Sequence, residues 1–231
     1  MNKPSLMEEH EPLSLGQALL REDPQYERIP VGHRVLLVGA ALDDGRSVAS
    51  RIARLWGSEP AGIAARRNIP VVESDANGGY GSVVVYATYT SGPQRITLHR
   101  PAIARLSAFA QAHISEFPAG LRMDAAALDI AAIKSIFIAH ELYHHFDCLR
   151  GNARLSRRHA VKIFSIGPWK WTSGLSSLGE IAAGAFAQRL LGLPFHPALL
   201  DVLFKQETMN HGEHGEHGGH GEEREYESLH A

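Results

Sequence analysis

One short segment near the middle of the chain constrains its structure more than any other. An apolar run leads into His140-Glu141-Leu142-Tyr143-His144, which is an H-E-x-x-H pattern. Residues four apart lie on the same face of an α-helix, so the two imidazoles would face one point with a carboxylate beside them. That arrangement suits a divalent metal ion. We therefore predict a helix from about Asp124 or Asp129 to Leu149, stopped by Gly151, that carries this metal box.

Length and composition are those of an ordinary globular protein. The chain has 231 residues, of which 44% are hydrophobic and 21% charged, and its formal net charge is -2. These values suit one large domain or two small ones with a buried core. A charge this close to neutral gives no general argument for nucleic-acid binding, and we expect no nucleic-acid partner. The lone cysteine, Cys148, excludes an internal disulfide framework.

The sequence carries no sign of export or of a membrane span. Residues 1–15 contain three glutamates and lack the apolar core of a signal peptide. The longest apolar stretches are far shorter than the roughly 20 residues that a membrane-spanning helix needs. We expect a soluble cytoplasmic protein that does not bind membranes.

Patterns along the chain predict three regions. Residues 1–45 are an N-terminal arm and leading segment with one short helix around Leu13–Leu20, and Val35–Ala41 is either a buried strand or part of a helix. Residues 46–205 form the main domain, with a basic insertion at 150–178. Residues 206–231 are a flexible tail rich in His, Gly and Glu.

The main domain is predicted to combine helices with one small sheet, which is an α+β fold. Besides the helix with the metal box, we predict helices over Arg46–Trp56, Ala102–Phe117 and Leu178–Leu191. Runs with strand character, separated by turn signals, are Ile69–Glu73, Ser82–Thr90 and Arg95–His99. We predict that these three runs form a small antiparallel sheet.

Two histidines do not complete a zinc site, because a catalytic zinc usually keeps three protein ligands and one open position. The best candidate for the third ligand is Glu180, in a predicted helix of small residues that a neighbouring helix can approach closely. A carboxylate in such surroundings needs a partner, and a metal ion is one. The alternative is a glutamate that only favours the N-terminus of its helix through the helix dipole.

The box and the downstream helix together resemble a known family. His140-Glu141-Leu142-x-His144, followed by Glu180-x-x-Ala183-x-x-Phe186-Ala187-x-x-Leu190-Leu191-x-x-Pro194, is similar to the ImmA/IrrE family of metallopeptidases. A strand reading Asn-Ile-Pro-Val-Val and a hairpin ending in Arg-Ile-Thr-Leu are also similar, so the resemblance covers roughly residues 46–195. Tyr143 stands where the family usually has glycine.

This resemblance implies a zincin-like fold of gluzincin type, in which a small sheet packs on an active-site helix and neighbouring helices. It implies that His140, His144 and Glu180 bind Zn²⁺ and that Glu141 acts as the general base. A zinc ion there would polarise the scissile carbonyl and lower the pKa of water. The implied activity is that of an endopeptidase on a protein or peptide substrate, such as a transcriptional repressor.

Several residues near the box have two interpretations. Tyr143, His145 and His159 are candidates for stabilising an oxyanion, although Tyr143 equally suits a packing role. Asp147 either orients a ligand histidine or is a solvated residue at the end of the helix. Cys148 is predicted to be a small buried apolar residue.

The basic insertion and the tail leave further alternatives open. Residues 150–171 carry six Lys and Arg and no acid, which suits a substrate-facing lid, a surface for an acidic partner or a nucleic-acid backbone, or a solvated segment. The tail histidines at 211, 214, 217 and 220 either bind metal weakly or have no role. Two other functions therefore remain beside the peptidase: a non-catalytic regulator that keeps a zincin scaffold, and a metal-binding protein that uses its tail.

Overall fold

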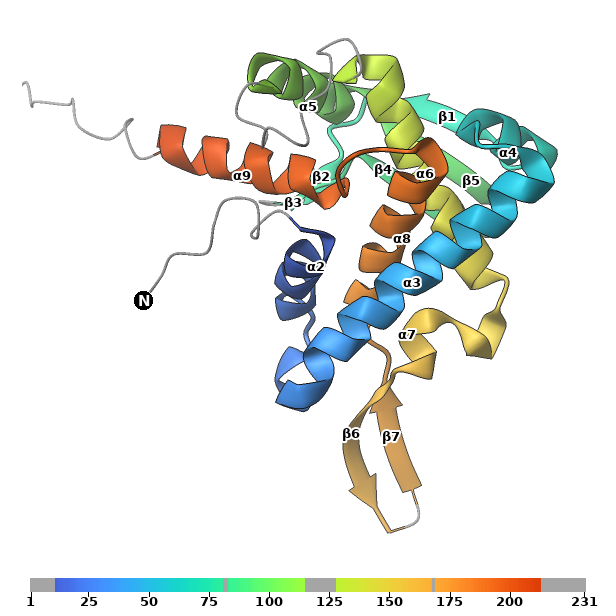
Figure 1. Cartoon of the computed structure of the whole chain (residues 1–231), viewed down its shortest axis with the longest axis vertical. Helices are drawn as coiled ribbons and strands as arrows, with labels where there is room; N and C mark the ends of the chain where they lie inside the picture. The colour runs from blue at the N-terminus through green and yellow to red at the C-terminus, as the bar shows by residue number, and fades with distance from the viewer. Residues whose placement is uncertain (1–10, 81–82, 115–127, 168, 213–231) are drawn as a thin grey trace, which may run out of the picture.

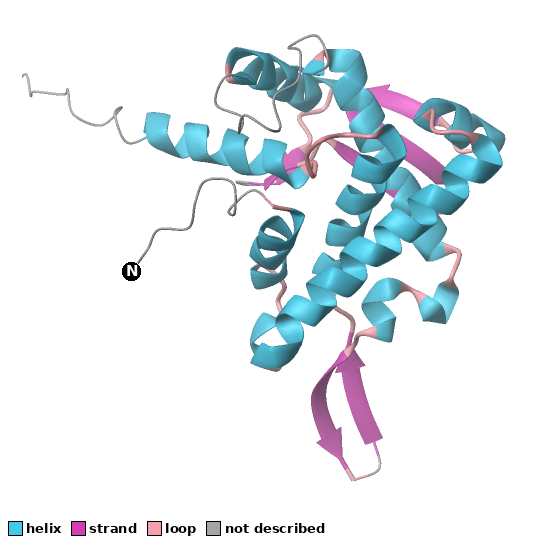
Figure 2. Ribbon diagram, viewed as in Figure 1, coloured by secondary structure: helices cyan, strands magenta, loops and turns pink. Residues whose placement is uncertain are grey.

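The structure, a computed structural model, describes residues 11–80, 83–114, 128–167 and 169–212. These residues form an α+β arrangement that is mostly helical, with a small sheet on one side and a separate hairpin at one end (Figures 1 and 2). The helices are α2 (Pro12–Arg21), α3 (Val31–Trp56), α4 (Pro60–Arg66), α5 (Arg100–Ala112), α6 (Ile130–Cys148), α7 (Leu155–Arg158), α8 (Ser176–Leu191) and α9 (Ala198–Gly212). The strands are β1 (Val71–Ser74), β2 (Gly79–Tyr80), β3 (Val83–Val84), β4 (Ala87–Ser91), β5 (Gln94–His99), β6 (Val161–Ile166) and β7 (Trp169–Ser173). The predicted α+β class is confirmed.

Helix α3 is 26 residues long and includes the segment that was predicted as either a buried strand or part of a helix. Val35–Ala41 lies inside it, and Val38 and Ala41 are fully buried one turn apart. The boundary predicted between residues 45 and 46 falls within this helix. Its continuity follows from packing along one face, because α3 contacts both α2 and α8.

Helix α8 lies against both α3 and α6, and most of its buried residues are small, with Phe186 as the largest of them. A Cβ atom at Gly45 of α3 would lie 2.1 Å from the carbonyl oxygen of Ala182. The two backbones can therefore approach this closely only because position 45 has no side chain.

The sheet has the strand order β1-β5-β4 and differs in one respect from the prediction. The β4–β5 hairpin is antiparallel as predicted, with Ala87 opposite Leu98 and Ser91 opposite Gln94. However, β1 and β5 are parallel, so the prediction of a wholly antiparallel sheet is wrong. The physical reason is the path of the chain between β1 and β5. After β1 the chain forms the small β2–β3 pair and then β4, and β5, which turns back from β4, therefore runs beside β1 in the same direction.

The helix with the metal box begins at Ile130, directly after Asp129, which is the later of its two predicted starts. The side chain of Asp129 accepts a hydrogen bond of 2.7 Å from the backbone N–H of Ala132 and caps the first turn of α6. Helix α8 begins two residues before its predicted start, and α5 ends at Ala112, before its predicted end at Phe117, a position outside the described residues.

Two elements are absent from the prediction, and a third changes one predicted boundary. Helix α4 and the β6–β7 hairpin inside the basic insertion were not predicted. The region predicted as a flexible tail from residue 206 begins inside α9, and its residues from 213 onward lie outside the described ranges. None of the helices in the described ranges has the length and hydropathy of a membrane-spanning segment.

Candidate metal centre

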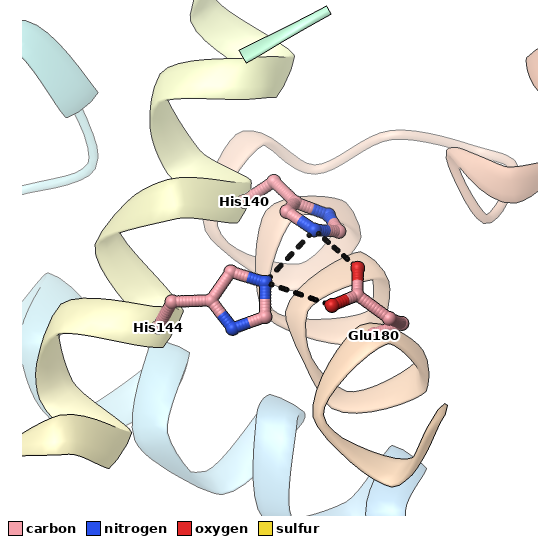
Figure 3. A group of neighbouring side chains, drawn as sticks. All are labelled: His140, His144 and Glu180. Carbon is pink, nitrogen blue, oxygen red and sulfur yellow. Dashed lines mark hydrogen bonds and ion pairs between the residues drawn. The ribbon is translucent and has the colours of Figure 1, made fainter. Parts of the chain in front are cut away.

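Two imidazoles from α6 and one carboxylate from α8 point toward one another (Figure 3). The Nε2 atoms of His140 and His144 lie 3.1 Å apart. The Glu180 carboxylate is 3.1 Å from His140 Nε2 through Oε2 and 3.4 Å from His144 Nε2 through Oε1. One ligand atom from each residue can be chosen so that all lie within 4.8 Å of one another. The group can therefore hold a metal ion.

The local sequence explains why these three side chains meet. His140 and His144 are four residues apart on a regular helix, which places their rings on one face. Glu180 lies in the second turn of α8, and the small residues around it let α8 pack against α6. The side chain of Glu180 is 53% exposed and those of the two histidines 20% and 24%, so solvent reaches the group.

The charges in the group stabilise one another. Desolvation opposes the charge on Glu180, but hydrogen bonds and attraction from His140 and His144 outweigh it and hold the pKa of Glu180 well below its usual range. Burial likewise lowers the pKa of His144, but the nearby Glu180 carboxylate more than compensates, and the net effect is a raised pKa. An ionised carboxylate facing two imidazoles is a suitable environment for a cation.

Glu141, the residue predicted to act as general base, lies beside this group. It is 7% exposed and lines a pocket of about 280 Å³ together with His140 and Glu180. Apolar side chains that form the other walls include Leu19, Val84, Leu106, Phe137 and Leu200. The pocket therefore combines a buried carboxylate, two of the three candidate ligands and apolar walls.

His196 also lines this pocket, and sequence analysis did not identify it. Its Nδ1 accepts a 3.3 Å hydrogen bond from the Ala198 N–H, so its Nε2 carries the proton and donates to the Ile181 carbonyl at 3.3 Å. Burial lowers the pKa of His196 to about 4, which keeps the ring neutral. In the sequence, His196 stands between Phe195 and Pro197 and has no partner at a spacing typical of metal ligands, so no sequence pattern marked it.

Tyr143 has the packing role that was one of its two predicted interpretations. It is fully buried, and its hydroxyl donates a 2.8 Å hydrogen bond to Asp44 on α3. Asp44 also accepts hydrogen bonds from Arg150 at 2.8 Å and Arg158 at 2.7 Å. Tyr143 therefore ties the metal-box helix to α3, and its hydroxyl is engaged by Asp44.

The other residues near the box connect α6 to its surroundings. Asp147 accepts a 3.0 Å hydrogen bond from the Leu155 N–H and pairs with Arg150 at 3.2 Å, so its contacts lie at the basic insertion. His145 Nδ1 is 3.0 Å from the Tyr89 hydroxyl of β4. His159 lines a different hollow, with Ile29 and Leu36, while Cys148 is half-buried where full burial was predicted.

The Asp44 cluster gives a prediction for stability and its dependence on pH. Burial opposes the charge of Asp44, but its hydrogen bonds to Arg150, Tyr143 and Arg158 hold its pKa below the usual 3.8. We expect Asp44→Asn to lower the free energy of unfolding at pH 7 by about 1–3 kcal/mol. A group with a depressed folded pKa stabilises above its unfolded pKa and loses this contribution as pH falls through the folded value. The difference in free energy of unfolding between the wild type and Asp44→Asn should therefore become smaller below about pH 4.

Urea unfolding at pH 7 and at pH 3 measures this difference. The control is Asp43→Asn, because Asp43 is 80% exposed and pairs at the surface with Arg46. We expect the control to change the free energy of unfolding by no more than about 0.5 kcal/mol at either pH. Equal effects of the two substitutions at pH 7 would contradict the role assigned to Asp44.

The described residues thus provide a group that can hold a metal ion, a buried carboxylate beside it and a largely apolar pocket. Comparisons with protein-family profiles, with characterised proteins and with solved structures found no match to this chain.

Proposed function

We propose that this chain is a zinc-dependent metallopeptidase with a zincin-like fold, acting as an endopeptidase on a protein or peptide. The observation that carries the proposal is the convergence of His140, His144 and Glu180, with Glu141 buried in the same pocket. The family resemblance of the two helices supports the same activity, and a transcriptional repressor is the substrate class that it favours.

The donor set supports zinc. Two imidazole nitrogens and one carboxylate form a common ligand set of catalytic zinc sites. Ligand atoms about 2.0–2.1 Å from a tetrahedral zinc ion lie about 3.3–3.4 Å from one another. The two histidine nitrogens lie 3.1 Å apart, and each lies 3.1 or 3.4 Å from a different oxygen of Glu180, so modest movements of the side chains would suffice to bind the ion.

The proposed chemistry divides between the ion and the chain. When bound, zinc would supply Lewis acidity toward the scissile carbonyl and toward the attacking water. Glu141 takes the proton of that water as general base and later delivers it to the leaving amine. The apolar walls around Glu141 limit access of bulk water and strengthen its interactions with the reacting groups.

A peptide substrate suits the surroundings of the pocket. Strand β4 is at the edge of the sheet, and Val85, Tyr86 and Ala87, at and just before its start, line the pocket. The edge of a sheet offers backbone groups that can pair with an extended peptide. A peptide lying along β4 would bring its backbone past Glu141 and the metal ligands.

The metal content of a ligand variant tests the site. We expect Glu180→Ala to weaken zinc binding at this site at least about 100-fold, because it removes one of three protein ligands. After dialysis against submicromolar zinc, mass spectrometry of the metal should find one zinc fewer per chain than in the wild type. Since the tail histidines are the same in both proteins, the difference reports the site alone.

The matched control is Glu27→Ala, which removes a glutamate that is 88% exposed. It should retain the zinc content of the wild type. Equal zinc content in the Glu180 variant and the wild type would contradict the proposed ligand set and would favour metal binding by the tail.

A further inference from the structure

The basic insertion folds into the β6–β7 hairpin, which projects away from the helices (Figures 1 and 2). In its outer part Phe164 lies opposite Trp171 and Ile166 lies opposite Trp169. Side chains alternate between the two faces of a strand, so these four large apolar residues share one face. We call this set the hairpin face.

The hairpin face is exposed to solvent. Ile166 is 69% exposed, Trp169 70%, Trp171 55% and Phe164 44%. The rings of Phe164 and Trp171 stack on each other with their centroids 4.8 Å apart. Contiguous exposed apolar residues of this kind usually mark an interaction surface.

The charge of the same segment has a single sign. Between Asp147 and Glu180 the chain contains six Lys and Arg and no acid. Arg150 and Arg158 pair with Asp44 where the segment leaves the body of the protein. Arg157 contacts the neutral Asn152, and Lys162 at the base of the hairpin is exposed, so their charges are not offset within the segment.

We propose that the hairpin docks this protein on an anionic lipid surface, with the hairpin face inserted among the headgroups. Tryptophan and other aromatic side chains favour the interface between lipid and water. Basic residues beside an inserted apolar surface are attracted to anionic headgroups. The hairpin and the segment that leads into it combine an exposed apolar face with basic side chains. The proposal does not depend on the metal centre.

Other occupants fit the hairpin less well. A second copy would bring two basic segments together, and like charges oppose such a contact. Single-stranded nucleic acid stacks on successive free aromatic faces, whereas two of the three aromatic rings here, Phe164 and Trp171, already stack on each other.

Flotation with vesicles tests the proposal on the full chain. We expect the wild type to float with vesicles of phosphatidylcholine and phosphatidylglycerol, to float less with phosphatidylcholine alone, and to dissociate as salt rises. Ile166→Ser combined with Trp169→Ser should weaken the partition coefficient at least about tenfold. Lys162→Gln should weaken it about fivefold on anionic vesicles only.

The matched control is Leu55→Ser, which removes an apolar side chain that is 63% exposed on α3. It should leave the partition coefficient unchanged. The proposal is overturned if the wild type does not float with anionic vesicles, or if the double variant binds them as tightly as the wild type. It is also overturned if the double variant instead abolishes a dimer in size-exclusion chromatography, or binding of a labelled oligonucleotide, while lipid binding persists.

Discussion

Replacing Glu141 with glutamine is expected to reduce peptide hydrolysis by about 100- to 10,000-fold while the zinc content stays the same. Glutamine has nearly the same shape as glutamate but cannot take a proton from water at neutral pH. Glu141 is not one of the three ligand residues, and it lines the pocket beside them. The substitution therefore removes proton transfer and leaves the metal ligands in position.

Two measurements on the same samples check this expectation. Cleavage of a proteome-derived peptide library, followed by mass spectrometry, measures hydrolysis across many sequences at once, and elemental analysis measures zinc. Glu27→Gln, at an exposed position, is the control and should cleave like the wild type. Undiminished cleavage by a zinc-loaded Glu141 variant would rule out the proposed mechanism. Zinc binding without cleavage in the wild type would favour a non-catalytic zincin-scaffold regulator.

Gly45→Ala is expected to lower the free energy of unfolding by about 3 kcal/mol. The added methyl group would lie 2.1 Å from the Ala182 carbonyl oxygen and 3.0 Å from the backbone nitrogen of Phe186. Both obstacles are backbone atoms of α8, so no side-chain rotation relieves the contact and the two helices must separate. Because Glu180 lies two residues before Ala182, the displacement should also weaken zinc binding.

Gly39→Ala on the same helix provides the control. Apart from the backbone of its own helix and its chain neighbours, nothing lies within 4 Å of a Cβ built at Gly39, so alanine fits there. Alanine is the better helix former, and we expect this variant to gain about 0.5–1 kcal/mol. Chemical denaturation of both variants measures the difference. Equal effects of the two substitutions would show that close contact of α3 with α8 does not limit stability.

The sequence predicted the features that depend on short-range periodicity. The spacing of His140 and His144 determines that their rings share a face once the segment is helical. Asp129 was one of two predicted starts of this helix, and in the structure its side chain caps the first turn. The alternation and the turn signal at residues 91–93 similarly predicted the β4–β5 hairpin. Glu180 was proposed from the small residues around it and from the family resemblance, and it meets the two histidines.

Features that join distant parts of the chain were decided only by the tertiary structure. Tyr143 and Asp44 are 99 positions apart, and no local pattern links them. The direction of β1 relative to β5 depends on the path of the connection between them, and the burial of His196 depends on the packing of the chain after α8.

Periodicity reports which face of an element is apolar, and this is a property of a few neighbouring residues. It does not report which other element covers that face, because this choice depends on packing and chain connection throughout the molecule. The sequence by itself therefore determined the metal box and its helix. Tertiary packing decided the closing of the site by α8, the anchoring of Tyr143 and the projection of the basic hairpin.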